Sequence, residues 1–228
     1  MGKKNAMRVY HMADENGEPE VIQSVTEEKD LGILFSDSLS FQKHINNSIS
    51  KANQMTGIMK RSFNYLTPKL VVTIYKTLIR PHLEYANVIW RPHLRKDINN
   101  LEKVQRRATK CVPQLSNFDY VDRLKILKLP TLEYRRLRGD MIQTYKLLHG
   151  LDDIDFKEFM VLNNNNRTRG HSLKLKCQAP KLDIRKHSFS VRIVKEWNSL
   201  HEDIVTAPNV HTFKVLLDAH WADRHNVY

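Results

Sequence analysis

Residues 97–111 read DINNLEKVQRRATKC, and this stretch encodes two opposite faces of one helix. Its apolar residues recur every three or four positions, the spacing of one side of an α-helix: Leu101, Val104, Ala108 and Cys111. Its cations fall on the other side: Lys103, Arg106, Arg107 and Lys110. Asp97 stands where a helix cap is expected. The stretch therefore predicts a helix that packs inward and presents positive charge outward.

Helical spacing continues toward the N-terminus as far as residue 37. A long helix is expected with Asp37, Ser38 or Ser40 as its cap and with one apolar face: Phe41, Ile45, Ile49, Ala52, Thr56 and Met59. Thr67 and Pro68 form a strong helix start, because a hydroxyl cap precedes proline at the first helical position. Pro81 is expected to end or sharply kink that helix, and residues 83–90 to resume as a short one.

Helical spacing also continues toward the C-terminus. Residues 120–129 predict a short helix stopped by Pro130. Thr131 starts another, with Gly150 after its end and with its core face formed by Leu137, Met141, Tyr145 and Leu148. Four asparagines at 163–166 mark a loop, residues 173–177 alternate like a strand, and two final helices contain Trp197 and Phe213 as core anchors. The last of these helices has Asn209 as its expected cap.

Residues 7–36 have the composition of short strands, with Asn16-Gly17 as a turn and Gly32 marking a close approach or a bulge. The expected fold is therefore mainly α with a small N-terminal antiparallel β element. Three parts are predicted: a β-rich part at 1–36, a basic helical bundle at 37–150, and a smaller C-terminal α(+β) unit at 151–228.

Positive charge is concentrated in the middle of the chain. The 228 residues have a net charge of +12, and residues 37–150 alone contain 21 Lys and Arg against 8 Asp and Glu. Such a concentration attracts polyanions, of which nucleic acid is the commonest. The alternative is a solvated basic face without a ligand.

Several kinds of chemistry have no support in the sequence. Cys111 and Cys177 are too few and too far apart for a disulfide framework or a zinc knuckle, and the apolar position of Cys111 predicts a buried, inert thiol. The Asp152-Asp153 pair lacks the context of a metal-binding hairpin and is expected to cap a helix. We expect no catalytic residue, metal, cofactor, secretory signal or membrane-spanning helix, and an intracellular location.

Ordered blocks along the chain resemble the reverse transcriptases of jockey-like non-LTR retrotransposons. The first three are 29–35 (KDLGILF), 39–45 (LSFQKHI) and 51–53 (KAN), similar to the stretch after the catalytic palm. The next three are 78–86 (LIRPHLEYA), 88–90 (VIW) and 101–108 (LEKVQRRA), similar to the thumb. Residues 185–200 (RKHSFSVRIVKEWNSL) with Phe213-Lys214 resemble the tail. Asp30 and His201 depart from the family, which more often has an aromatic residue and proline there.

The resemblance implies that the fingers and the palm, with their catalytic aspartates, would lie before residue 1. Residues 1–36 would then be the end of the palm, with a primer-grip-like hairpin at Leu31, Gly32 and Ile33. Residues 37–150 would be a thumb-like bundle that packs against an RNA or DNA template–primer duplex without sequence preference. The chain is accordingly expected to be a polymerase fragment that binds nucleic acid and has no polymerase activity in isolation.

Twelve basic residues are the candidates for contacts to the nucleic-acid backbone: Lys60, Arg61, Lys69, Lys76, Arg80, Arg91, Arg95, Lys96, Lys103, Arg106, Arg107 and Lys110. The alternative function is that of a non-enzymatic helical interaction module, adopted by the host, whose basic face binds an acidic protein.

Overall fold

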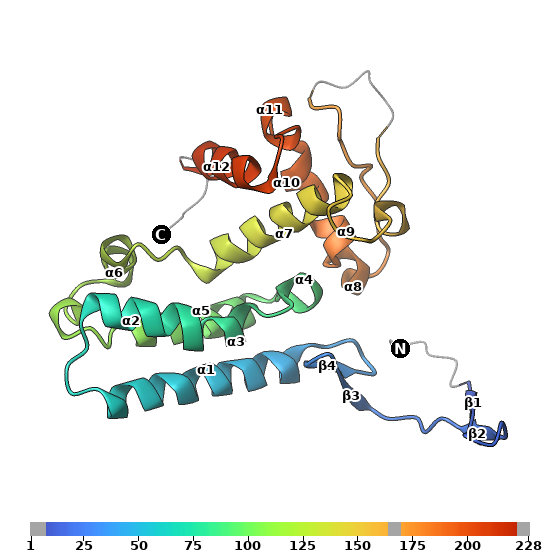
Figure 1. The fold of residues 1–228 in the computed structure, drawn as a ribbon, viewed down its shortest axis with the longest axis horizontal. Helices are drawn as coiled ribbons and strands as arrows, with labels where there is room; N and C mark the ends of the chain where they lie inside the picture. The colour runs from blue at the N-terminus through green and yellow to red at the C-terminus, as the bar shows by residue number, and fades with distance from the viewer. Residues whose placement is uncertain (1–7, 164–169, 223–228) are drawn as a thin grey trace.

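The computed structural model describes residues 8–163 and 170–222 (Figure 1). The fold is mainly α-helical, with two small antiparallel sheets near the N-terminus. The predicted fold class is therefore confirmed. None of the helices in these ranges has the length and apolar content that crossing a bilayer requires.

Four short strands form two separate hairpins rather than the single meander that the sequence suggested. Strand β1 (His11–Ala13) pairs with β2 (Pro19–Val21), and β3 (Glu27–Asp30) pairs with β4 (Ile33–Ser36). Every residue of β1 and β2 is exposed, and Figure 1 shows this hairpin standing away from the body. Without a buried side chain, no packing brings the first hairpin against β3. The predicted turn at Asn16-Gly17 does form, with Gly17 at a φ of 83°.

Helix α1 (Gln42–Ser62) buries the predicted face, including Ile45, Ala52 and Met59. The expected caps Asp37, Ser38 and Ser40 do not occupy its N-cap position, which belongs to Phe41. The ring of Phe41 packs edge-on against Phe35 of β4, with 5.7 Å between ring centroids. Leu39, at a φ of 57°, and hydrogen bonds between the Ser36 hydroxyl and the Ser40 backbone hold the preceding residues in a turn, so the helix starts after them. The Ser40 hydroxyl still accepts the Gln42 N–H at 3.4 Å.

Helix α2 (Pro68–Ile74) begins as predicted, because the Thr67 hydroxyl accepts the Leu70 N–H at 3.2 Å. The helical path does not end at Pro81. It passes through a π-helical segment, η1 (Tyr75–Ile79), in which the Arg80 N–H donates to the Tyr75 carbonyl at 2.8 Å. Pro81 then becomes the first residue of α3 (Pro81–Glu84), a position that suits a residue without an N–H. Ala86, at a φ of 50°, separates α3 from α4 (Asn87–Trp90), so residues 83–90 are not one helix.

Helix α5 (Arg95–Thr109) contains the stretch that carries the two opposite faces. Asp97 is not its cap, as the sequence suggested, because Leu94 holds that position. The Asp97 side chain is instead buried and accepts a 3.0 Å hydrogen bond from Gln42 Nε2 of α1. This carboxylate therefore ties two helices together. A 3-10 turn, η2 (Pro113–Leu115), follows α5.

Helix α6 (Tyr120–Leu127) starts at the predicted residue and is capped by Asp119, whose side chain accepts the Asp122 N–H at 2.8 Å. It ends two residues before the predicted end, because Lys128 adopts the left-handed conformation with a φ of 51°. Helix α7 (Leu132–Leu148) is capped by Thr131, which accepts the Tyr134 N–H at 3.2 Å. Gly150 follows α7 at a φ of 62°, the left-handed conformation expected after a helix end.

The remaining segments after α7 are three to five residues long, except for the last helix. They are η3 (Phe156–Glu158), α8 (Asp183–Lys186), α9 (Phe189–Arg192), α10 (Val194–Asn198), α11 (Glu202–Val205) and α12 (Val210–Trp221). Asn209 caps α12 as predicted, and Trp197 and Phe213 are fully buried as predicted. The expected strand at 173–177 is reduced to one bridge between Leu162 and Leu175. Asn164, Asn165 and Asn166 of the predicted loop lie outside the described residues.

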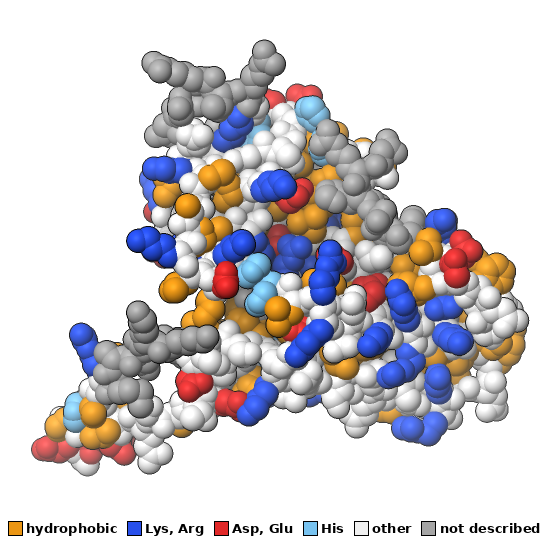
Figure 2. Space-filling view, turned by 180° about the vertical axis from the view of Figure 1, so that it is seen from behind, with side chains coloured by type: hydrophobic (Ala, Val, Ile, Leu, Met, Phe, Trp, Pro, Cys, Tyr) orange, Lys and Arg blue, Asp and Glu red, His pale blue; other side chains and the backbone are white. Residues whose placement is uncertain are grey.

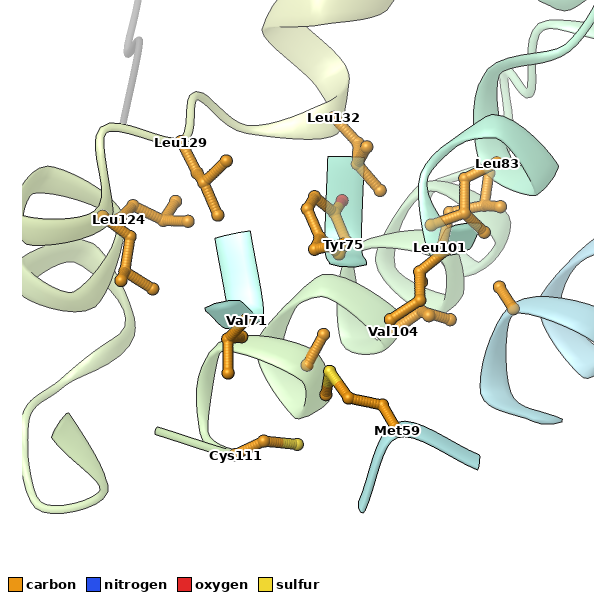
Figure 3. Packing of buried hydrophobic residues seen from close by; sticks show 14 of the residues in the cluster. Met59, Val71, Tyr75, Leu83, Leu101, Val104, Cys111, Leu124, Leu129 and Leu132 are labelled. Atoms are coloured by element: carbon orange, nitrogen blue, oxygen red, sulfur yellow. The ribbon is translucent and has the colours of Figure 1, made fainter. Parts of the chain in front are cut away.

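Buried apolar side chains form two clusters that divide near the start of α7. The first cluster runs from Ile33 to Leu132, and the second from Tyr134 to Trp221. Figure 3 shows Met59 of α1, Tyr75 of η1 and Leu124 of α6 among the side chains of the first cluster. The packing thus divides near residue 133 and not at residue 150, the boundary predicted from the sequence.

Candidate nucleic-acid interface

The predicted basic face of α5 lies on the surface. Leu101, Val104 and Ala108 are buried, and the four cations on the other side of the helix are exposed: Lys103, Arg106, Arg107 and Lys110. Figure 2 shows a gathering of Lys and Arg side chains on the side of the molecule where α5 lies. Helical spacing alone explains this arrangement, because burial of the apolar stripe turns the cations outward.

Helix α1 packs along α5 and contributes further positive charge. The 21 residues of α1 include no Asp or Glu. Its last turn contains two exposed cations, Lys60 and Arg61. Lys51 is also exposed, but it lines a separate cavity with His44. Lys43, near the start of α1, forms an ion pair with Glu27.

A shallow groove of about 380 Å³ separates the outer faces of α1 and α5. Its polar lining consists of Asn46, Ser50, Asn53, Asn100, Lys103 and Arg107. Arg107 Nη1 donates to Asn53 Oδ1 at 2.5 Å, and Lys103 Nζ donates to Asn100 Oδ1 at 3.2 Å. These amides position both cations without neutralising them. In the part of the chain that the structure describes, no Asp or Glu lines this groove.

The two acids of α5 do not face this groove. Asp97 is buried against Gln42. Glu102 is half-buried, and its carboxylate accepts the Leu132 N–H at 3.0 Å and the Tyr120 hydroxyl. Burial raises the pKa of Glu102, although these hydrogen bonds act in the opposite direction. The outward field of α5 is therefore positive.

The structure places the other predicted cations in different settings. Arg80 and Arg91 are engaged by carboxylates, Arg80 by Glu84 at 3.5 Å and Arg91 by Asp140 at 2.5 Å. Both are partly buried. Neither is therefore free to contact a phosphate, in contrast to the prediction. Lys69 and Lys76 are exposed, but on α2 and η1 rather than on α5. Lys96 is exposed at the start of α5. Arg95 is exposed there too, 3.5 Å from Glu133.

The primer-grip-like residues form the turn between β3 and β4. Leu31 and Gly32 both have positive φ, 44° and 86°, and Ile33 is buried. The Tyr85 hydroxyl donates to the Leu31 carbonyl at 2.9 Å, and a Cβ on Gly32 would lie 3.4 Å from the Tyr85 ring. Gly32 therefore permits the close approach that the sequence suggested, and α3 holds the tip of the hairpin.

A cavity of about 430 Å³ lies beside this turn, and His44 forms part of its wall. The Leu34 N–H donates to His44 Nδ1 at 3.3 Å. Burial, followed by the charge of Lys51, lowers the pKa of His44. His44 is therefore a neutral ring that accepts a hydrogen bond from the hairpin.

Other groups with potential reactivity have structural roles. Cys111 is buried as predicted, and burial raises the pKa of its thiol, which disfavours the nucleophilic thiolate. Asp152 does not cap a helix as expected: it accepts a 2.7 Å hydrogen bond from Gln143 and lies 3.7 Å from Lys146 Nζ. Asp155 instead caps η3. Within 8–163 and 170–222, no group of three or more His, Cys, Asp or Glu side chains could hold a metal ion.

Comparisons with known proteins give a distant relative. A protein of Caenorhabditis elegans named Uncharacterized protein B0403.1 is 26% identical over 144 residues, which cover 60% of this chain and 70% of that protein. No protein-family model matches the chain, and no solved structure matches it. The α1–α5 face consists of the groove between the two helices and the exposed cations around it: Lys60, Arg61, Lys103, Arg106, Arg107 and Lys110.

Proposed function

We propose that this chain binds the backbone of a nucleic-acid duplex through the α1–α5 face, as the thumb-like part of a retrotransposon reverse transcriptase. The groove between α1 and α5 carries this proposal, because cations and amides line it without an opposing carboxylate. Lysine, arginine and asparagine side chains are common donors to phosphate oxygens. The resemblance of the sequence blocks to the thumb of jockey-like elements agrees with this placement.

The geometry of α5 suits a backbone rather than a base sequence. Lys103 and Lys110 are seven residues apart, which is about 10 Å along a helix, and Arg106 and Arg107 lie between them. Such a row of cations can follow the phosphates along the outside of a duplex without entering its major or minor groove. Phosphate contacts fix position and carry no sequence information. The proposed function is therefore binding without sequence preference.

The proposal assigns no reaction to the chain. Polymerases stabilise the transferring phosphate with two metal ions held by carboxylates. Asp152, the first residue of the Asp152-Asp153 pair, is occupied by Gln143 and Lys146 of α7. The chemistry of a reverse transcriptase would come from a palm, and this chain would hold the template–primer duplex.

Binding of two labelled duplexes with unrelated sequences tests the proposal, with polyglutamate as a competitor. Fluorescence anisotropy should give equal affinities for both duplexes at low salt, with polyglutamate a much weaker competitor than unlabelled duplex. A strong preference for one duplex would contradict backbone binding. Failure to bind either duplex, combined with tight binding of polyglutamate, would favour a module that binds an acidic protein.

A further inference from the structure

A second hollow lies between α5, α6 and α7, on the opposite side of the α5 cations from the α1 groove. Its volume is about 520 Å³, within the usual range of small-ligand sites. Arg106 belongs to both surfaces, because it is exposed on α5 and also lines this cleft. Apolar side chains from three helices complete the walls: Ile98, Val121 and Leu137. The cleft is thus continuous with the proposed duplex-binding face.

A hydrogen-bond network fixes the aromatic wall of the cleft. The Tyr120 hydroxyl donates to Glu102, and Gln105 Nε2 donates to the Tyr120 oxygen at 3.1 Å. The guanidinium carbon of Arg106 lies 4.6 Å from the centre of the Tyr120 ring. A cation held over an aromatic face at this distance is favourable. Ring and guanidinium are therefore already arranged before any ligand arrives.

The lining of the cleft has one more cation than anions: Arg91, Arg95 and Arg106 against Glu102 and Glu133. Glu102 is occupied by Tyr120 and Leu132, and Glu133 lies 3.5 Å from Arg95. Arg136 is 2% exposed, and its two Nη atoms have no hydrogen-bond partner among the described residues. Burial lowers the pKa of Arg136 to about 10, so it remains a cation at neutral pH. Arg136 does not line the cleft itself, but its charge interacts with those of Glu102 and Glu133, which do.

We propose that this cleft receives an unpaired nucleotide at the end of the duplex that α5 holds. Its phosphate would lie against Arg95, and its base would stack on the outer face of the Arg106 guanidinium, which the Tyr120 ring supports from behind, beside the apolar walls. A ligand with a charged group and a flat, partly apolar body satisfies both parts of the lining. Bases stack on aromatic rings and on Arg with little dependence on sequence. This inference rests on the proposed function and adds single-stranded ends to the ligands of the same surface.

The cleft continues toward the second hydrophobic cluster. A neighbouring cavity of about 370 Å³ shares Arg91, Arg95 and Glu133 with it. This neighbouring cavity reaches His93 and His187, whose rings stack with 4.2 Å between centroids. Figure 2 shows histidine, Lys and Arg side chains around the hollow between the two parts of the molecule. A strand leaving the cleft would therefore meet another flat surface, formed by the two histidine rings.

Three forms of one RNA–DNA hybrid test this inference by anisotropy: blunt, with a short single-stranded overhang, and with an abasic overhang of equal length. The full-length chain should bind the overhang form about tenfold more tightly than the blunt form, as expected for stacking of at least one base. The abasic overhang should lose most of this gain. An abasic overhang that retains the full gain would overturn the base-binding role of the cleft.

A matched pair of variants locates the effect. Val121 lines the cleft and is 41% exposed, whereas Val215 of α12 is 54% exposed and does not line it. Val121→Glu should abolish the preference for the overhang, and Val215→Glu should retain it. Equal preferences in both variants would overturn the inference. If the unmodified chain binds the blunt duplex but shows no preference for the overhang, the proposed role of the cleft is overturned and the proposed function stands. If it does not bind the blunt duplex, the proposed function is overturned as well.

Discussion

Arg192 on α9 donates two hydrogen bonds, each 2.9 Å long, to the fully buried carboxylate of Asp140 on α7. Arg91 donates a third at 2.5 Å from the segment between α4 and α5. Arg192 also donates to the Val88 carbonyl at 2.8 Å. One acid therefore holds together segments that are far apart in the sequence and that meet where the two hydrophobic clusters join.

Replacing Asp140 should destabilise the whole fold. Asp140→Ala leaves two partly buried guanidinium groups without their carboxylate, and breaking such a pair costs about 3–5 kcal/mol. Urea unfolding monitored by circular dichroism measures the change. Asp122→Ala is the matched control, because its ion pair with Lys125 is exposed on both sides and is worth about 1 kcal/mol or less. Similar losses in both variants would contradict a central role for Asp140.

Stability should fall as the pH drops below 6.5. Burial lowers the pKa of His44, His171 and His187 below the ordinary value of 6.5. The charge of Lys51 lowers the pKa of His44 further, and His93 does the same to His187. Each ring then binds fewer protons when folded than when unfolded, so its contribution is complete above pH 6.5 and declines toward the lowered pKa. Thermal unfolding between about pH 7.5 and about pH 5.5 measures this decline.

Two variants distinguish the effect of these histidines on stability from the opposite effect of Glu102. Burial raises the pKa of Glu102, which makes the folded chain relatively more stable as the pH falls. Glu102→Gln should therefore steepen the loss of stability on acidification, and His44→Asn should reduce it. A melting temperature that stays constant from pH 7.5 to pH 5.5 in both variants would contradict the assignment.

Trp197 and Phe213 should act through stability rather than through ligand binding. Both are fully buried, with 6.1 Å between their ring centroids. Truncation of either residue to Ala should cost about 3–5 kcal/mol. Duplex affinity of the fraction that remains folded, measured at low temperature, should be unchanged. An unchanged melting temperature combined with weaker RNA binding would reverse this assignment.

The chain should not extend a primer. Incubation with poly(A)/oligo(dT), Mg²⁺ and nucleotide should give the same incorporation as buffer, because the proposed role is to hold the duplex. Incorporation that depends on Mg²⁺ and survives repurification would contradict this expectation.

Helical spacing was sufficient to predict which side of α5 is exposed, because the apolar stripe determines the orientation of a helix. The pairing of Arg80 with Glu84 has the i,i+4 spacing of neighbours on one helix, so the sequence did contain a signal for it. The pairing of Arg91 could not be predicted, because α7 brings Asp140 close from a distant part of the sequence. The same limitation applies to Asp97, whose sequence context is that of a cap but whose partner is Gln42 of α1.

Two features of the candidate site needed the tertiary structure. The groove between α1 and α5 depends on the pairing of Arg107 with Asn53, residues on different helices. The cleft depends on Tyr120 of α6 meeting Arg106 of α5. Neither pair has a characteristic spacing in the sequence, because each is formed by the packing of two separate helices.

The salt dependence of duplex binding tests the central claim most directly. The variant Lys103→Gln, Arg106→Gln, Arg107→Gln, Lys110→Gln removes the four exposed cations of α5. If these side chains neutralise four phosphates, the slope of log affinity against log salt should be smaller by about three to four units than in the unmodified chain. Fluorescence anisotropy at several salt concentrations, on two unrelated duplexes, gives both slopes. Equal affinities and equal slopes for the two proteins would contradict the proposal that this face binds nucleic acid.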